Sequence, residues 1–177
     1  METKCGSCGR LLGPFESIDV AGEGTRCYPC FNRETADRLG LVFDEPWFQP
    51  IVVADADGAE HTFTIRSMLV PTGHEMEAIE MIGKEAVGYR FALLGGFEAD
   101  PWELFHRLYA TMRREVGIRH VQRTKLGWQL TDHQRLTGRI EWDSDSDNRM
   151  PMIVIDGKPF TWEPSRSHAH DVRRLHP

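Results

Sequence analysis

Four cysteines near the N-terminus are the residues of this 177-residue chain whose spacing points most directly to chemistry. They form two pairs, Cys5-x2-Cys8 and Cys27-x2-Cys30, with 18 residues between the pairs. Two cysteines spaced in this way can both face one ion from a tight turn, and zinc takes four such ligands at tetrahedral corners. The spacing therefore predicts that Cys5, Cys8, Cys27 and Cys30 bind one Zn²⁺ ion per chain.

The predicted zinc site is structural rather than catalytic, because four thiolates leave no position open for water. A segment of 40 residues buries little apolar surface by itself. Metal binding would therefore supply much of the folding free energy of residues 1–40. The alternative is that the four cysteines bind no metal.

The elements around the cysteines are a hairpin and a short helix. Residues 15–20 alternate apolar with other side chains, residues 21–24 form a turn, and residues 31–39 read as a helix that ends at Gly40. In this order the segment resembles a treble-clef zinc finger over residues 1–40, with a zinc ribbon as the alternative.

The rest of the chain, residues 41–163, is predicted to be one α+β domain, an antiparallel sheet with one long packed helix. The helix is expected at 101–116, because Asp100 is a good N-cap, Pro101 suits the first position and Gly117 is a stop signal. Alternation and turn residues predict strands on both sides of it. The expected strands are 48–54, 61–66, 74–81, 89–94, 137–142, 152–155 and 158–162.

The charge balance argues against binding to nucleic acid. Residues 41–163 contain 13 Lys/Arg and 20 Asp/Glu, and residues 1–40 contain 5 and 6. An acidic surface repels phosphate backbones. The sequence shows neither a secretory signal nor an apolar run that could cross a membrane, so we expect a cytoplasmic protein with no membrane contact.

The remaining polar side chains form no catalytic pattern in the sequence, so no catalytic or cofactor-binding residue is assigned. His74-Glu75 begins like a zinc-protease motif, but Ala78 stands where the second histidine belongs. The histidines of the body are expected to be surface or core residues. They are His61, His74, His106, His120 and His133.

The tryptophans are expected to fill the core between sheet and helix, although Trp is also frequent at interaction hot spots. Trp128 lies in a polar stretch and is expected to be the most exposed. The five are Trp47, Trp102, Trp128, Trp142 and Trp162.

Residues 1–162 resemble an uncharacterised bacterial family in which a four-cysteine finger is joined to an α+β domain. The residues that carry the resemblance are 27–32, 140–143 and 156–158. The resemblance implies no known activity. The leading hypothesis is a zinc-stabilised module that binds an unknown protein partner. The alternatives are a nucleic-acid-associated regulator that uses the finger, and an enzyme whose site is assembled from scattered residues.

The last segment, residues 164–177, is predicted to be a disordered tail, because it has few apolar residues and no periodicity. Reading residues 166–174 one base forward permits the apolar sequence Asp-Leu-Met-Leu-Met-Thr-Phe-Glu-Gly. The hypothesis is that a frameshift replaced a C-terminal helix with this tail, which the coding DNA would test.

Overall fold

The computed structural model describes residues 3–13, 15–83, 88–131, 136–143, 146–147 and 149–161. The predicted tail, residues 164–177, and Trp162 lie outside these residues. Two α-helices and a larger number of antiparallel strands make up the described chain, with the cysteines at its N-terminal end. The predicted α+β class is confirmed.

The N-terminal segment folds as two small hairpins followed by a helix. Strand β1 (Thr3–Lys4) pairs with β2 (Leu11–Leu12), and β3 (Ser17–Val20) pairs with β4 (Gly24–Cys27). Helix α1 (Tyr28–Leu39) follows β4 directly and ends at Gly40, whose φ of 66° is the left-handed conformation that glycine adopts without strain. The predicted hairpin and helix are confirmed, although α1 begins three residues earlier than expected.

The central sheet has the strand order β5-β6-β7-β8, and all of its neighbours are antiparallel. Strand β6 is much longer than β5, which pairs only with residues 60–63 of it. Along the rest of β6, that edge pairs with no strand of the described residues. The bounds are β5 (Ile51–Ala54), β6 (Glu60–Val70), β7 (Gly73–Glu80) and β8 (Arg90–Gly95).

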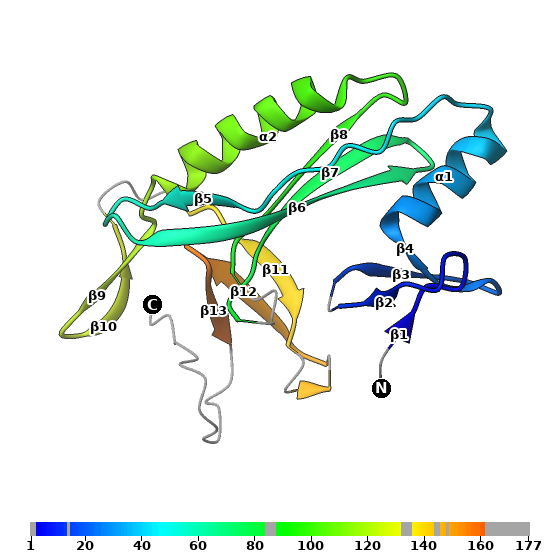
Figure 1. The fold of residues 1–177 in the computed structure, drawn as a ribbon. Coiled ribbons are helices and arrows are strands. Elements are labelled where there is room, and N and C mark those ends of the chain that lie inside the picture. Colours follow the sequence, from blue (N-terminus) through cyan, green and yellow to red (C-terminus); the bar gives the residue numbers. More distant parts are fainter. Residues whose placement is uncertain are drawn as a thin grey trace.

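Helix α2 (Pro101–Val116) covers one face of this sheet (Figure 1). It begins where predicted, because the Asp100 side chain accepts a hydrogen bond from the Trp102 backbone N–H at 2.8 Å. One stripe of the helix packs against the sheet, with residues at four-residue spacing. The buried residues of this stripe are Leu104, Leu108, Met112 and Val116.

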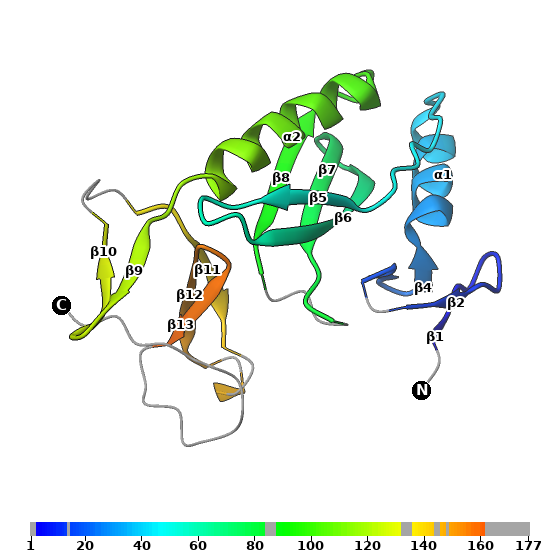
Figure 2. The ribbon, with the colours of Figure 1, turned by 60° about the vertical axis from the view of Figure 1, so that its left-hand side comes forward.

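The C-terminal strands form a hairpin and a second sheet, which are drawn below the central sheet in Figures 1 and 2. The hairpin of β9 (Val121–Thr124) and β10 (Gly127–Leu130) was not predicted, because its polar residues hide the alternation that marks a strand. The second sheet has the order β11-β12-β13. Its strands are β11 (Arg139–Trp142), β12 (Pro151–Ile155) and β13 (Lys158–Thr161).

The expectation that the tryptophans fill the core is wrong for three of them. Trp47, Trp102 and Trp142 are 74%, 58% and 63% exposed. Trp102 lies in the first turn of α2, away from the stripe that packs on the sheet, and Trp142 lies on the edge strand β11. Trp128 is only half-buried, and it is less exposed than those three because it packs edge-on against Phe160 at 5.8 Å. No helix among the described residues is long and apolar enough to cross a membrane.

Candidate metal centre

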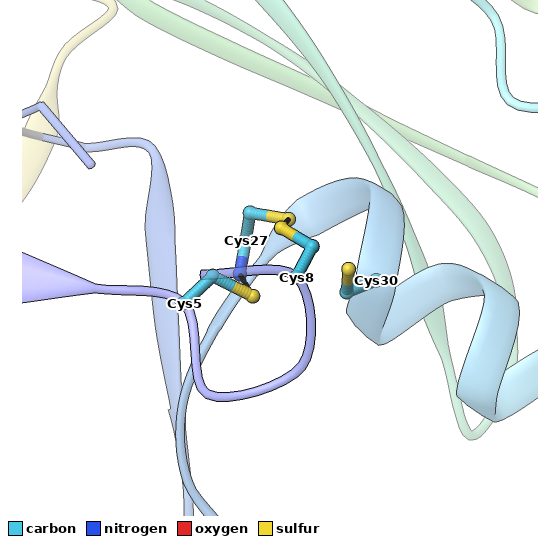
Figure 3. A group of neighbouring side chains, drawn as sticks. All are labelled: Cys5, Cys8, Cys27 and Cys30. Atoms are coloured by element: carbon cyan, nitrogen blue, oxygen red, sulfur yellow. Dashed lines mark hydrogen bonds between the residues drawn. The ribbon is translucent and has the colours of Figure 1, made fainter. Parts of the chain in front are cut away.

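The four cysteines come together in one cluster between the first hairpin and the start of α1 (Figure 3). Their sulfur atoms all lie within 4.8 Å of one another. The Sγ atoms of Cys8 and Cys27 are 3.9 Å apart, which is far beyond the length of a disulfide bond. All four are free thiols, and three of them are buried while Cys8 is exposed. The cluster can hold a metal ion.

Each pair of cysteines is positioned by a tight backbone turn. In the first pair, the Gly9 N–H donates to the Cys5 carbonyl and the Cys5 N–H donates to the Arg10 carbonyl, both at 2.9 Å. In the second pair, Cys27 is the N-cap of α1, and Cys30 lies in the first helical turn. The start of the helix therefore directs the Cys27 and Cys30 thiols toward the backbone turn that carries Cys5 and Cys8.

Hydrogen bonds to sulfur prepare part of the cluster for a thiolate. Burial alone would raise the pKa of Cys5, but hydrogen bonds from the backbone N–H groups of Cys27, Cys8 and Ser7 outweigh it and lower the pKa to about 6. Burial raises the pKa of Cys30 to about 12, and the neighbouring thiols add to this rise. Four thiolates would repel one another without a cation, and a divalent ion among them offsets that repulsion.

The helix that follows the cluster is fixed to the unpaired edge of β6. The buried Asn32 side chain accepts a hydrogen bond from the Leu69 N–H at 2.8 Å and donates to the Ser67 carbonyl at 3.0 Å. This is the donor and acceptor pattern that a neighbouring strand would offer. Asn32 also donates to the Glu45 carboxylate at 2.8 Å. The Asn32 amide therefore takes the place of a strand at this edge.

A second contact joins α1 to the sheet through its first residue. Arg66 donates to the Tyr28 hydroxyl at 2.7 Å, and its guanidinium lies over the Tyr28 ring at 5.0 Å from the centroid. Arg66 also forms an ion pair with Glu77, which Arg90 contacts from the next strand at 2.6 Å. Burial would raise the pKa of Glu77, but the two arginines outweigh it and lower that pKa. The cysteine cluster is thus built into the same body as the sheet.

Two histidines of the body lie in polar contacts that sequence spacing did not reveal. His61 lies between two carboxylates, with Nδ1 at 2.6 Å from Glu80 and Nε2 at 3.4 Å from Asp55. His74 is fully buried, and its Nε2 is 2.6 Å from the Ser67 hydroxyl. Glu80 and Ser67 reach these histidines because β6 pairs with β7, and only a correct register for these strands would have predicted the contacts. Asp55 reaches His61 from the turn between β5 and β6.

Other predicted histidines take no part in the metal cluster. His106 is exposed on α2 and His120 is buried before β9, and His133 lies outside the described residues. Within the described residues, the cysteines are the one group of three or more possible ligands that lie close together.

The comparisons with known proteins match the body of the chain to two families. Residues 45–117, from the segment before β5 to the end of α2, match a domain of unknown function (DUF7686). Residues 120–164, which contain the β9–β10 hairpin and the second sheet, match another domain of unknown function (DUF7713). No curated protein and no solved structure matches the chain. The two matched segments meet between α2 and β9, where the chain passes from the helix to the C-terminal strands.

Proposed function

We propose that this protein is a zinc-stabilised module that binds another protein, with Cys5, Cys8, Cys27 and Cys30 as the ligands of one structural zinc ion. Zn–S bonds of about 2.3 Å at tetrahedral angles place the sulfurs about 3.8 Å apart. The separation of 3.9 Å between the Cys8 and Cys27 sulfurs supports this geometry.

The treble-clef form of the finger is part of the proposal. A first hairpin with two ligands, a second hairpin and a helix that carries the last ligand follow one another in that order, which supports it. In this role the metal holds the start of α1, and α1 in turn covers the open edge of β6 through Asn32. Covering such an edge protects it against pairing with other chains.

The observation that carries the interaction role is an exposed aromatic surface at the start of α2. Trp102 is 58% exposed and packs edge-on against Phe48 at 5.1 Å, and Phe48 stacks on Phe105 at 4.6 Å. Trp47, the residue before Phe48, is 74% exposed. We call these four residues the aromatic surface. Exposed tryptophans on a rigid base are frequent anchors of protein interfaces, because burying them removes much apolar area from water.

The test is a pull-down from the native host with zinc-loaded protein. We expect a partner protein to be retained by the wild type and lost with the double variant Trp47→Ala/Trp102→Ala. The matched control is Trp142→Ala, which removes a tryptophan of similar exposure from the distant strand β11 and should keep the partner. Retention of the same partner by the double variant would contradict the role of this surface.

The same protein should not bind random duplex DNA at physiological salt, because both the finger and the body are acidic overall. We expect a dissociation constant weaker than about 10⁻⁴ M, the weak end of non-specific binding. Binding in the micromolar range that weakens with salt would favour the nucleic-acid alternative instead.

A further inference from the structure

The aromatic surface at the start of α2 is built from two segments that are distant in the sequence, residues 41–50 and residues 91–106. Phe48 of the first segment contacts Trp102 and Phe105 of the second, and Trp102 also packs edge-on against Phe105 at 6.3 Å between ring centroids. Figures 1 and 2 draw the start of α2 at the top and β11–β13 at the bottom. The charges that a partner meets at this surface are therefore those of the two segments rather than those of the C-terminal strands.

Five carboxylates lie in the same two segments, and all five side chains belong to exposed residues. Asp100 is the N-cap of α2 and Glu103 lies in its first turn, so they stand on either side of Trp102 along the chain. Each of the five is at most four residues from a tryptophan of the aromatic surface. The chain spans no more than about 14 Å over that length. The five are Asp44, Glu45, Glu98, Asp100 and Glu103.

No ion pair among the described residues involves any of these five carboxylates. Glu45 and Asp100 accept hydrogen bonds, but their donors are a neutral amide and a backbone N–H. The two segments contain no lysine or arginine. Arg38 and Arg90, which precede the segments, are each paired with a carboxylate elsewhere, and Arg107, which follows the second segment, forms no ion pair with a described residue. Five carboxylates against one unpaired arginine leave the aromatic surface negative.

The exposed indole rings of this surface are suited to a cation as well. Tryptophan is the best aromatic partner in a cation–π contact, and arginine is the side chain that most often stacks on it. The cation–π contacts of the described chain are at Tyr28, Tyr109 and Trp128. The rings of Trp47 and Trp102 therefore have no cation from the described chain. A guanidinium group that stacked on one of them would also lie among the carboxylates.

We propose that the partner of this protein presents a basic segment, whose arginine side chains stack on Trp47 and Trp102 and pair with the carboxylates around them. This inference rests on the proposed function and adds the chemistry of the partner. The aromatic contacts supply the apolar area that is buried, whereas the charges select the partner and make binding depend on salt. An acidic segment would be repelled by the same carboxylates, and a neutral segment would leave them without counter-charges.

The first test is a titration of the full-length, zinc-loaded protein with three labelled peptides of equal length. One contains several arginines among glycine and serine, and the others have citrulline or glutamate at the same positions. Citrulline keeps the shape of arginine without its charge. The arginine peptide should bind at low salt with a dissociation constant on the order of 100 μM, and added salt should weaken it. The citrulline peptide should bind at least about tenfold more weakly, and the glutamate peptide should not bind. Equal affinities for arginine and citrulline, or no binding of the arginine peptide, would overturn the proposal.

The second test separates the charge of this surface from the overall acidity of the chain. Glu98→Gln/Glu103→Gln removes two carboxylates beside the aromatic surface and should weaken binding of the arginine peptide by about three- to tenfold. The matched control is Glu60→Gln/Asp147→Asn, which removes two exposed carboxylates elsewhere and changes the net charge by the same amount. It should leave the affinity within about twofold. Equal weakening by both double variants would contradict the proposal.

The tryptophan variants connect these measurements with the pull-down. Trp47→Ala/Trp102→Ala should abolish binding of the arginine peptide, whereas Trp142→Ala should retain it. If a partner from the host were lost with the tryptophan double variant while the arginine peptide did not bind, the interaction surface would stand and its partner would not be basic. If the wild type retained neither a partner nor the peptide, the proposed function itself would fail.

Discussion

The contact between α1 and β6 and the β12–β13 turn at Asp156 are two places where a buried polar side chain meets backbone groups that are distant in the sequence. At the first, every hydrogen-bonding group of the Asn32 side chain that is described has a partner within the chain. At the second, Asp156 uses one oxygen for two backbone N–H groups, and the other oxygen has none in the described chain. The first side chain is fully hydrogen-bonded within the chain, whereas the second keeps one buried oxygen without a partner among the described residues.

The difference shows that two buried polar side chains can be satisfied to different degrees by the chain around them. A buried group that is satisfied from within makes its full contribution to folding. A buried group that is only half satisfied weakens the fold by itself, and a ligand that supplies the missing partner offsets the cost. Changes at the two places should therefore differ in their effect on stability, and the following predictions test that.

The largest effect is expected from removing the metal. Cys27→Ser takes away a proposed zinc ligand that is also the N-cap of α1, and structural zinc sites contribute on the order of 10 kcal/mol to folding. Purified wild-type protein should contain about one zinc per chain, whereas this variant should lose it and become protease-sensitive over residues 1–40. Metal content by mass spectrometry and limited proteolysis measure both.

A matched control for the metal is Ser7→Ala, which changes an exposed side chain in the turn between Cys5 and Cys8 and leaves all four thiols in place. It should keep the zinc. If the wild-type protein contained no metal and its N-terminus still resisted protease, the four cysteines would be structural without an ion.

The next effect is at Asn32. Asn32→Ala leaves the Leu69 N–H and the Ser67 carbonyl buried without partners, and we expect it to lower the free energy of unfolding by roughly 2–5 kcal/mol. Urea denaturation followed by fluorescence measures this. The control is Glu45→Gln, which keeps an oxygen that accepts from Asn32 and should cost less than about 1 kcal/mol. Similar small costs for both variants would mean that α1 does not depend on this contact.

The sequence predicted the parts of this molecule that local spacing determines. The two cysteine pairs predicted the cluster, and Asp100, Pro101 and Gly117 predicted the helix from end to end. Asn32 and Asp156 could not be found in this way, because their backbone partners lie 35 to 37 residues away along the chain. Only the tertiary packing of α1 on β6, and of the β12–β13 turn beside the start of β9, brings such residues together, and the sequence contains no local signal for it.

The exposed tryptophans also could not be predicted from the local sequence. Composition alone favours a buried position for such large side chains. Whether Trp102 faces the sheet depends on the rotation of α2, which the stripe from Leu104 to Val116 sets. The position of Trp102 follows from this stripe once the helix is placed.

A smaller effect is expected at His74, which borders the contact between α1 and β6 through Ser67. Burial lowers the pKa of His74 below its ordinary value of 6.5. As the pH falls through 6.5, the unfolded chain therefore binds a proton that the folded chain does not bind, and stability declines. The decline stops below the folded pKa. Above pH 6.5 His74 should contribute no pH dependence.

Urea midpoints at pH 7.5, 6.5 and 5.5 measure this contribution. His74→Gln removes the titrating group while keeping a side chain that can bond to Ser67, so its loss of stability on acidification should be smaller than that of the wild type. His106→Gln, on the exposed face of α2, should behave as the wild type does. A wild-type pH dependence in the His74 variant would show that other groups account for it.

The smallest change in the free energy of unfolding is expected for Asp156→Asn, which tests the comparison most directly. Asp156→Asn weakens the hydrogen bonds from His120 and Val121, because a neutral amide oxygen is a poorer acceptor than a carboxylate. It also removes a buried charge that forms no ion pair with any described residue, which is favourable. The φ of 50° suits asparagine as well as aspartate. These terms oppose one another, so we expect a change in unfolding free energy within about 1 kcal/mol.

Asp156→Ala loses both hydrogen bonds and should cost roughly 2–4 kcal/mol. If Asp156→Asn cost as much as Asp156→Ala, the charged carboxylate would be essential to this turn, as the Asn32 amide is to the edge of β6.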